Sequence, residues 1–360
     1  MSLSNVTISI DPTRLQRAVA VAEDAVHNGP YPSAVIAVAN AETTILTHTV
    51  SHPDRPPAAL DSIFLLASIT KPIVATAIMR LVEEGRLLLS DPIVRYIPEF
   101  ELFEKGRVTV WHLLTHTSGL DESPWWREMM FEQRASADQL VEMACRCALR
   151  FEPGARFEYN TLAFVILGEL IARIGGRPYP EYLQQHIFGP LGMRDTSFTP
   201  STAQQPRAMP VYPPPTDPDG ERRVRYFTSL AAPGGGLWST AADLVAFGQA
   251  LLRGGRSGDY HLLSLAAIDV MTRLHTGGLI EIVEHTPVPA GYGLGWGKPG
   301  PDGVMLGSPS AYEHGGVTGT RLYIDPEWDL VFVFLANQWG IEASASKQAL
   351  NAVYGALRRS

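Results

Sequence analysis

The chain has 360 residues, 45% of them hydrophobic and 18% charged, with a formal net charge of −8. These values are typical of a globular protein with one large domain or two, long enough to bury a substantial core. The densest basic cluster is Arg222, Arg223 and Arg225, and it lies beside acidic residues. Composition and charge therefore argue against nucleic acid and anionic membranes as partners.

The sequence has no pattern that predicts export or membrane insertion. It does not open with a basic segment followed by an apolar run, and no apolar stretch approaches the roughly 20 residues of a membrane-spanning helix. Its two cysteines, Cys145 and Cys147, are separated by one residue in an expected helix, where their side chains point apart and do not form a disulfide. We therefore expect a cytoplasmic protein; a leader on a longer precursor would leave no trace in this sequence.

The first part of the chain predicts a helix, a hairpin and a second, buried helix. Residues 11–28 have helical spacing, and two β-rich runs, residues 34–39 and 43–49, flank a short polar turn. Residues 63–67 are apolar and lead to Ser68, after which apolar residues recur at helical spacing. The sequence therefore places Ser68 at the start of a buried helix.

The middle of the chain is predicted to be mostly helical. Helical patterns occur near residues 109–115, 136–149, 161–174 and 179–188. Prolines are then frequent between residues 200 and 218, which favours a rigid excursion between elements over a polyproline ligand for a partner protein. Asp219 and Gly220 predict the turn of a small hairpin in this excursion.

Strand patterns return near the end of the chain, at residues 320–324 and 330–335, and a final helix is expected after them. We expect these late strands to join the early hairpin in one sheet. This gives an α/β (α+β) fold in which residues 1–91 and 236–360 form one discontinuous domain and residues 92–235 form an inserted, mostly helical domain. A cleft between two such domains is the expected ligand site.

Ser68 and Lys71 lie three residues apart and therefore share one face of the predicted helix. A neutral Lys71 can accept the hydroxyl proton of Ser68, which is the minimum equipment for an acyl-transfer nucleophile. The same spacing recurs at Ser344 and Lys347, so the pattern alone does not identify a site. At Ser68, however, a buried helix begins, whose free N–H groups and positive end stabilise negative charge and disfavour a protonated Lys71. We therefore treat Ser68 as the candidate nucleophile and Ser344 as part of a packing helix.

Two further segments carry groups that such a nucleophile requires. Tyr159 directly precedes a predicted helix, and His314 is followed by two glycines and Val317. Glycines allow the backbone to approach a ligand closely. A nucleophile needs a base, a proton path to the leaving group and two donors for the oxyanion, and these segments are the candidates to supply them.

With these residues, the chain resembles the serine β-lactamase and penicillin-binding protein superfamily, in particular its class C-like branch of esterases, D-aminopeptidases and DD-peptidases. The resemblance rests on Ser68-x-x-Lys71 and covers nearly the whole chain in the order of the family. The further matching blocks are residues 113–120, 189–193, 235–243 and 292–296. The resemblance implies a β-lactamase/transpeptidase-like fold, with an antiparallel sheet flanked by helices, and a reaction without cofactor or metal.

The resemblance also implies a role for each candidate residue. Ser68 would be the nucleophile, and Lys71 with Tyr159 would form the general-base pair that later returns the proton to the leaving group. The backbone N–H groups of Ser68 and Val317 would form the oxyanion hole, a contribution of about 3 kcal/mol per donor.

Two motifs depart from the family pattern, and both departures concern substrate binding. The second motif, which usually ends in Asn after Tyr159, ends in Thr161, so a hydroxyl replaces an amide that would bind an acylamide substrate. The third motif, usually Lys-Thr-Gly, begins with His314 and ends with Gly316, and a His with an ordinary pKa is mostly neutral at pH 7. β-Lactams and D-Ala-D-Ala peptides carry a carboxylate that the missing cation would bind. We therefore expect hydrolysis of esters with small or medium acyl groups.

Two other functions stay open. The same residues could cleave amides, as in a β-lactamase, a DD-carboxypeptidase or a D-aminopeptidase, or the pocket could bind a ligand without catalysis. The expected partner is a small-molecule ester or amide, and the sequence does not predict the oligomeric state.

Two remaining pairs of side chains are further candidates for a site. Trp125 and Trp126 belong to an apolar cluster that either lines an acyl pocket or packs as core or lid. His112 and His116 have the i, i+4 spacing of a zinc-binding pair, but no acidic residue lies beside His112 as that motif requires. We therefore expect no metal site.

Overall fold

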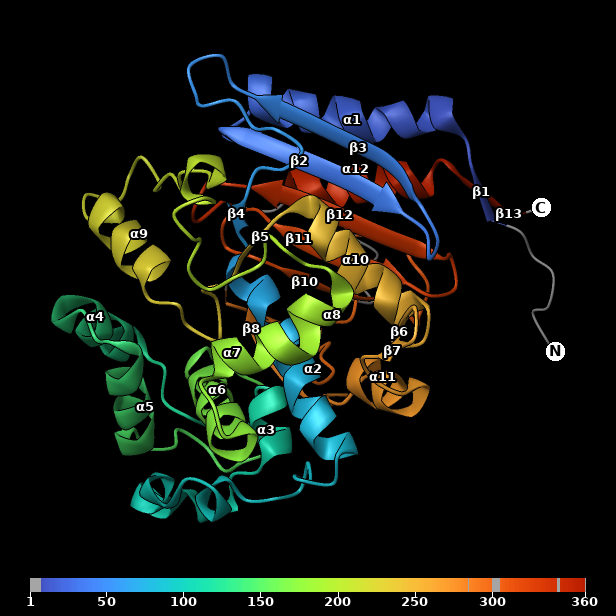
Figure 1. Cartoon of the computed structure of the whole chain (residues 1–360). Coiled ribbons are helices and arrows are strands. Elements are labelled where there is room, and N and C mark those ends of the chain that lie inside the picture. The colour runs from blue at the N-terminus through green and yellow to red at the C-terminus, as the bar shows by residue number, and fades with distance from the viewer. Residues whose placement is uncertain (1–7, 284, 300–304, 342–343, 360) are drawn as a thin grey trace.

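The computed structural model describes residues 8–283, 285–299, 305–341 and 344–359, and its centre is a five-stranded antiparallel sheet (Figure 1). In spatial order, the strands are β10 (Tyr312–Gly315), β11 (Arg321–Asp325), β12 (Leu330–Ala336), β2 (Ser33–Ala39) and β3 (Thr44–Ser51). The late strand β12 pairs with the early strand β2, with Phe334 opposite Ile36. The prediction that both ends of the chain share one sheet is therefore confirmed.

Both faces of the sheet are covered by helices, so its central strands are buried throughout. Side chains alternate between the faces, as the period of a strand requires. Ile36 and Phe334 pack in the apolar cluster beneath α1 and α12, whereas Val35 and Val333 pack in the larger cluster with α2 and α10. These helices are α1 (Pro12–His27), α12 (Ser344–Tyr354), α2 (Thr70–Glu83) and α10 (Ala241–Leu252).

Helix α2 runs through the larger cluster, and the turn that opens it carries Ser68. A short 3-10 helix, η1 (Ala67–Ile69), leads directly into α2, almost all of whose side chains are buried. This confirms the predicted position of Ser68. Ala67 has a φ of +50°, in the left-handed region that residues other than glycine adopt rarely. The turn before Ser68 therefore depends on tertiary contacts to keep this conformation.

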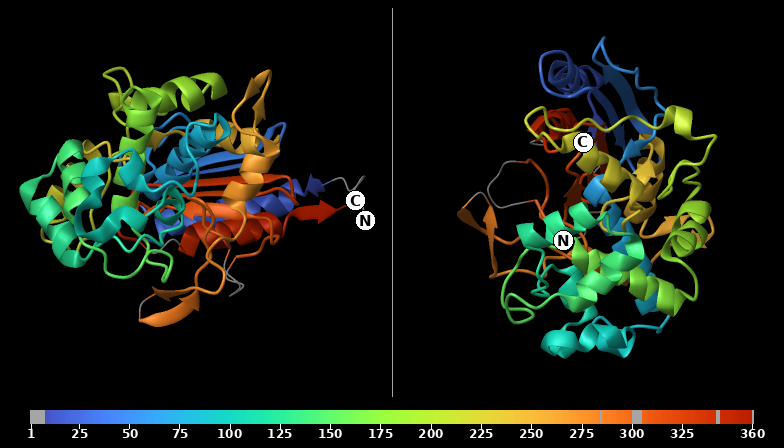
Figure 2. Two further views of the ribbon diagram at one scale, coloured as in Figure 1. Left: turned by 90° about the horizontal axis from the view of Figure 1, so that it is seen from below. Right: turned by 90° about the vertical axis from the view of Figure 1, so that its left-hand side faces the viewer.

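A mostly helical region lies beside α2 (Figures 1 and 2), and the predicted helical segments are found there with shifted ends. Its elements are η2 (Ile93–Arg95), η3 (Pro98–Arg107), α3 (Val110–Leu114), α4 (Pro124–Gln133), α5 (Ala137–Arg146), α6 (Leu162–Gly175), α7 (Tyr179–Leu183), the π-helical η4 (Gln184–Phe188), α8 (Gly189–Leu191), η5 (Gln205–Arg207) and α9 (Gly220–Ser229). The large apolar cluster joins this region to α2 and the sheet, and the proposed domain boundaries stay a prediction.

The predicted hairpin turn at Asp219 and Gly220 is wrong, because these residues begin helix α9. An Asp is also a typical residue at a helix start, so the same dipeptide fits both structures. Along α9, Val224 is buried, while Arg222 forms an ion pair with Glu132 of α4. Contacts with another helix thus stabilise a helix that the local turn signal does not predict.

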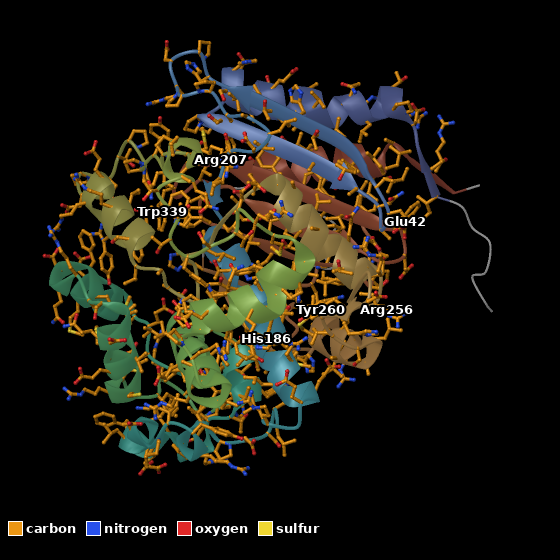
Figure 3. All side chains as sticks on the ribbon, viewed as in Figure 1. Glu42, His186, Arg207, Arg256, Tyr260 and Trp339 are labelled. Atoms are coloured by element: carbon orange, nitrogen blue, oxygen red, sulfur yellow. The ribbon has the colours of Figure 1, made fainter. Side chains whose placement is uncertain are left out.

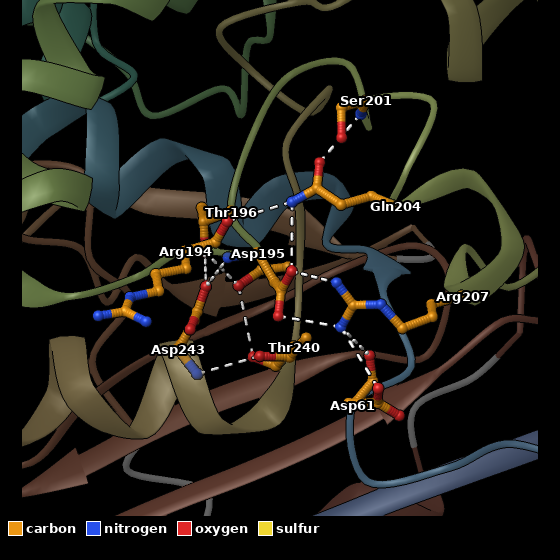
Figure 4. Close-up of polar contacts among 10 residues, drawn as sticks. Asp61, Arg194, Asp195, Thr196, Ser201, Gln204, Arg207, Thr240 and Asp243 are labelled. Carbon is orange, nitrogen blue, oxygen red and sulfur yellow. Dashed lines mark hydrogen bonds and ion pairs between the residues drawn. The ribbon is translucent and has the colours of Figure 1, made fainter.

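A polar network anchors the proline-containing segment to the strand that leads to Ser68 (Figure 4). Arg207 forms ion pairs with Asp61 and Asp195, and the Asp243 carboxylate accepts hydrogen bonds from the Asp195 N–H (2.9 Å) and the Thr196 hydroxyl (2.7 Å). Burial raises the pKa of Asp243. The segment is therefore fixed to the body of the molecule, as the interpretation of a rigid excursion requires.

The remaining strands form four two-stranded sheets, and one of them projects from the body of the molecule (Figure 2). The pairs are β1 (Ile8–Ile10) with β13 (Leu357–Arg359), β4 (Phe64–Leu65) with β5 (Trp238–Ser239), β6 (Arg256–Ser257) with β7 (Tyr260–His261), and the projecting β8 (Ile280–Val283) with β9 (Thr286–Pro289). Helix α11 (Leu265–Thr272) follows β7. Across the described ranges, no helix combines the length and the apolar character needed to cross a membrane.

Candidate active site

Lys71 and Ser68 lie side by side at the start of α2, as their spacing predicts. The Lys71 Nζ atom is 3.3 Å from Ser68 Oγ, 2.7 Å from the carbonyl oxygen of Gly234 and 3.5 Å from Thr161 Oγ1. The Lys71 side chain is fully buried. An amine held by fixed oxygens in this way has little freedom to turn away from the serine.

Tyr159 completes the group, because its hydroxyl lies close enough to the Ser68 side chain to influence its own pKa. The Lys71 Nζ atom lies 4.8 Å from the centre of the Tyr159 ring. Burial raises the pKa of Tyr159 above its ordinary value, and the proximity of Ser68 opposes this shift. The phenol is therefore protonated at neutral pH. The structure thus brings Ser68, Lys71 and Tyr159 together, and their catalytic roles stay predictions.

The turn that carries Ser68 is held by the loop between β10 and β11. The hydroxyl of Thr320 donates to the carbonyl of Leu66 over 2.9 Å. At Gly316, an added Cβ would lie 2.2 Å from Thr320 Oγ1 and 2.4 Å from that carbonyl oxygen, so the close approach of the two segments requires glycine. Val317 follows in the same loop and lines the same cavity as Ser68.

His314 is buried beside this loop, but it does not face the cavity that Ser68 lines. Its Nδ1–H donates to the carbonyl of Gly315 (2.8 Å), so its Nε2 accepts the hydroxyl proton of Tyr292 (2.8 Å). Burial is the largest cause that lowers the pKa of His314, to about 3. At the ordinary pKa of a histidine, the ring would already be mostly neutral at pH 7. The lower pKa makes the ring more reliably neutral, which strengthens the inference that the third motif has no cation.

The low pKa of His314 predicts a loss of stability in acid. The folded protein keeps the ring neutral down to about pH 3, whereas an unfolded His binds a proton near pH 6.5. The contribution of His314 to the free energy of unfolding is therefore fully present above about pH 6.5, and it is lost as the pH decreases toward 3. In urea unfolding at pH 7 and pH 4, we expect a smaller fall in the free energy of unfolding for His314→Gln than for the wild type. Equal falls in both proteins would contradict this assignment.

Ser68, Tyr159, Thr161 and Val317 line one cavity of about 330 Å³. The rest of its wall is mostly apolar and includes Met130 of α4, Leu140 of α5, Val165 of α6 and Phe227 of α9. Among the described side chains, Glu122 is the one charged group in the wall, and no Lys or Arg lines it. The volume is near the lower end of ligand pockets, which suits a small or medium substrate.

Glu122 is a site residue that the sequence analysis missed. Its carboxylate accepts hydrogen bonds from the backbone N–H groups of Thr161 and Leu162 at the start of α6, and the side chain is 8% exposed. A carboxylate is favourable at a helix N-terminus. The two partners are far apart in the sequence, so no local pattern indicates this contact.

Gly234 is a second site residue that no local pattern indicates. Its carbonyl accepts the hydrogen bond from Lys71, and an added Cβ would lie 2.7 Å from Thr161 Cγ2. The glycine therefore allows the backbone to reach the amine. The side-chain amide of Asn160 is engaged elsewhere, because it donates to the Leu120 carbonyl and accepts the N–H of Ala163 within α6. Thr161 is therefore the residue after Tyr159 that contacts Lys71.

The other predicted residues lie elsewhere or outside the description. Trp125 and Trp126 belong to α4, but their side chains lie outside what the structure describes. Ser344 begins α12, which covers the opposite face of the sheet from α2. His116 is engaged locally, because its Nδ1 accepts the N–H of Asn160 (3.0 Å). In the described ranges, no three His, Cys, Asp or Glu side chains form a group suited to a metal.

The chain is similar over most of its length to members of one family. A family model described as Beta-lactamase matches residues 18–356. A Salmonella enteritidis protein with the provisional name D-alanyl-D-alanine carboxypeptidase is 28% identical over 332 residues, covering 80% of this chain and 72% of that protein.

Two solved structures share the fold. A penicillin-binding protein homologue from Caulobacter crescentus superposes with a TM-score of 0.82 and 22% identity, covering 98% of this chain and 100% of that one. EstCE1, described as a hydrolase with promiscuous acyltransferase activity, has a TM-score of 0.81 and 24% identity, covering 95% and 99% of the two chains. The expected β-lactamase/transpeptidase-like fold is confirmed.

Proposed function

Because the chain belongs to the β-lactamase family of serine hydrolases, we propose that it cleaves neutral esters with small or medium acyl groups through an acyl-Ser68 intermediate. The observation that carries this proposal is the cavity around Ser68. Its wall contains hydroxyl and apolar groups and one carboxylate, Glu122, and no cationic side chain among the described residues.

The contacts of Lys71 support a role as the base for Ser68. A neutral amine has two N–H groups and one lone pair. If these N–H groups donate to the Gly234 carbonyl and to Thr161 Oγ1, the lone pair is left for the Ser68 hydroxyl proton. Ser68 Oγ then attacks the ester carbonyl, and the backbone N–H groups of Ser68 and Val317 stabilise the negative oxygen.

The protonated phenol of Tyr159 is suited to the next step. Its hydroxyl, within hydrogen-bond reach of Ser68, donates a proton to the leaving alkoxide as the ester C–O bond breaks and the acyl group stays on Ser68. The proton held by Lys71 then returns to the phenolate. In the second half of the reaction, water attacks the acyl group while the same groups accept its proton, and the acid and free Ser68 are released.

Charge in the cavity favours neutral substrates over the carboxylates of β-lactams and D-Ala-D-Ala peptides. Such a carboxylate would enter a mostly apolar space whose described wall contains Glu122 and no Lys or Arg, and the neutral His314 supplies no positive charge. Two like charges about 4 Å apart repel by about 1 kcal/mol in water and by about 4 kcal/mol near a protein surface. This repulsion would lower kcat/KM for a substrate with such a carboxylate by about one to three orders of magnitude relative to a neutral substrate.

A substrate panel tests the proposal. We expect kcat/KM for p-nitrophenyl butyrate to exceed the values for a chromogenic cephalosporin and for D-alanyl peptides. We also expect Glu122→Gln to raise kcat/KM for a p-nitrophenyl monoester of succinate, relative to the butyrate, by about tenfold, because it removes the like charge. A cephalosporin or D-peptide that dominates the panel, or an unchanged succinate ratio, would count against a preference for neutral esters.

Amide cleavage by the same residues is the second candidate. It is supported by the name of the Salmonella relative, whose substrate would be a D-alanyl peptide. Dominance of the D-alanyl peptides in the same panel would establish it.

A further inference from the structure

Trp339 lies between the cavity of Ser68 and a second hollow on the outside of the molecule. Its side chain belongs to the wall of the 330 Å³ cavity and also to the wall of an outer depression of about 640 Å³. Figure 3 shows Trp339 close to α9, in the loop that follows β12. One indole ring therefore borders both spaces.

One stacking contact holds this ring, and two backbone hydrogen bonds hold the segment that carries it. The ring of Phe227, from α9, stacks on it with the centroids 5.2 Å apart and the planes at 22°. The backbone N–H of Trp339 donates to the carbonyl of Tyr212, and the backbone N–H of Gly340 donates to the carbonyl of Val317, each over 2.8 Å. Phe227 also lines the cavity of Ser68. The stacked pair is thus tied to the loop that carries Val317.

The outer depression has a wall of mixed character. Its apolar part includes Pro30, Pro32, Pro214 and Ile341 in addition to Trp339, and its polar part includes His52, Asp54 and Gln338. The described cation in its wall, Arg55, is engaged with the face of the Tyr212 ring at 4.4 Å. A hydrocarbon chain that extended past the indole would therefore find the proline and Ile341 surface of this wall to pack against.

We propose that the Phe227–Trp339 pair sets the acyl-chain length of the substrate by closing the cavity of Ser68 toward the outer depression. The inference rests on the proposed esterase function and names the class of substrate more closely: acyl chains that end within the cavity. Without the indole, the two spaces join, and longer acyl chains can extend into the outer depression.

The test is the acyl-length profile of p-nitrophenyl esters from acetate to decanoate. For the wild type, kcat/KM peaks at a short or medium chain. For Trp339→Ala, the ratio of kcat/KM for decanoate to that for butyrate rises by at least about tenfold, the scale on which pocket size discriminates between chains. Trp339→Phe keeps a ring and gives a smaller rise, and Phe227→Ala gives a rise because the stacking partner is lost.

Trp328→Ala is the matched control. Trp328 lies in the turn between β11 and β12 and packs against the ring of Tyr354, away from the cavity wall. This variant leaves the decanoate-to-butyrate ratio unchanged. An unchanged ratio in folded Trp339→Ala overturns the proposal, and so does an equal rise in Trp328→Ala.

Labelling separates this inference from the proposed ester substrate. Fluorophosphonates with ethyl or decyl chains are compared by their rates of reaction with Ser68 in wild type and Trp339→Ala, which requires no ester turnover. A selective gain for the decyl reagent supports the role of the aromatic pair even if no ester in the panel is cleaved. If esters are cleaved but Trp339→Ala has the same chain preference as the wild type in both turnover and labelling, the role of the pair is overturned. The ester proposal then stands.

Discussion

Replacing Ser68 with alanine is expected to lower kcat/KM for p-nitrophenyl butyrate by at least about 10⁴-fold, because the bond-forming oxygen is lost. Lys71→Ala should be nearly as damaging, since the buried amine 3.3 Å from Ser68 Oγ is the base that the serine requires. The double variant should lose little more than either single variant, because the members of one catalytic unit fail together.

The chain contains its own control for this prediction. Ser344 and Lys347 repeat the spacing of Ser68 and Lys71, but they lie on α12 on the opposite face of the sheet. Ser344→Ala and Lys347→Ala should therefore keep turnover within about twofold, the range expected of surface substitutions. If the losses of the single variants multiply in the Ser68 and Lys71 double variant, these two residues do not act as one unit. If Ser344→Ala loses as much turnover as Ser68→Ala, the loss is not specific to the candidate site.

Tyr159→Phe is expected to lower kcat by about 10²- to 10⁴-fold, the usual contribution of a positioned proton donor or acceptor. The ring would remain packed against His116, with centroids 4.4 Å apart in the wild type, so only the hydroxyl near Ser68 is lost. Esters with poorer leaving alcohols should suffer more than p-nitrophenyl esters, because an alkyl alkoxide needs the proton and p-nitrophenolate does not.

Tyr312→Phe is the matched control for this hydroxyl. Tyr312 is a buried tyrosine whose hydroxyl has no hydrogen-bond partner within the described part of the chain. The substitution should leave kcat unchanged. If Tyr159→Phe reduces turnover equally for all leaving groups, its hydroxyl orients Ser68 rather than delivering a proton.

Much of this fold follows from local patterns. Residues 34–39 and 330–335 are continuous apolar runs, a pattern typical of strands covered on both faces, and β2 and β12 are buried and adjacent. Helical spacing after Ser68 predicts α2. Local signals fail at Asp219, where contacts with α4 stabilise a helix instead of a turn.

The candidate site was predictable where a motif fixes the spacing and unpredictable where only the tertiary fold brings groups together. Ser68 and Lys71 share a helix face, so their contact follows from the sequence. Glu122, Gly234 and Trp339 come from three separate segments, and no local pattern connects them with Ser68. The charge and shape of the cavity depend on these residues, which is why the sequence predicts the reaction in more detail than it predicts the substrate.

Covalent labelling of the intact protein tests the central claim most directly. After reaction with a fluorophosphonate, mass spectrometry should detect one stoichiometric adduct on the peptide that contains Ser68. The adduct should be absent from Ser68→Ala and retained in Ser344→Ala. An adduct on a different residue, or no adduct on folded wild-type protein with any acylating or phosphonylating reagent, would contradict the account and favour a pocket that binds ligands without catalysis.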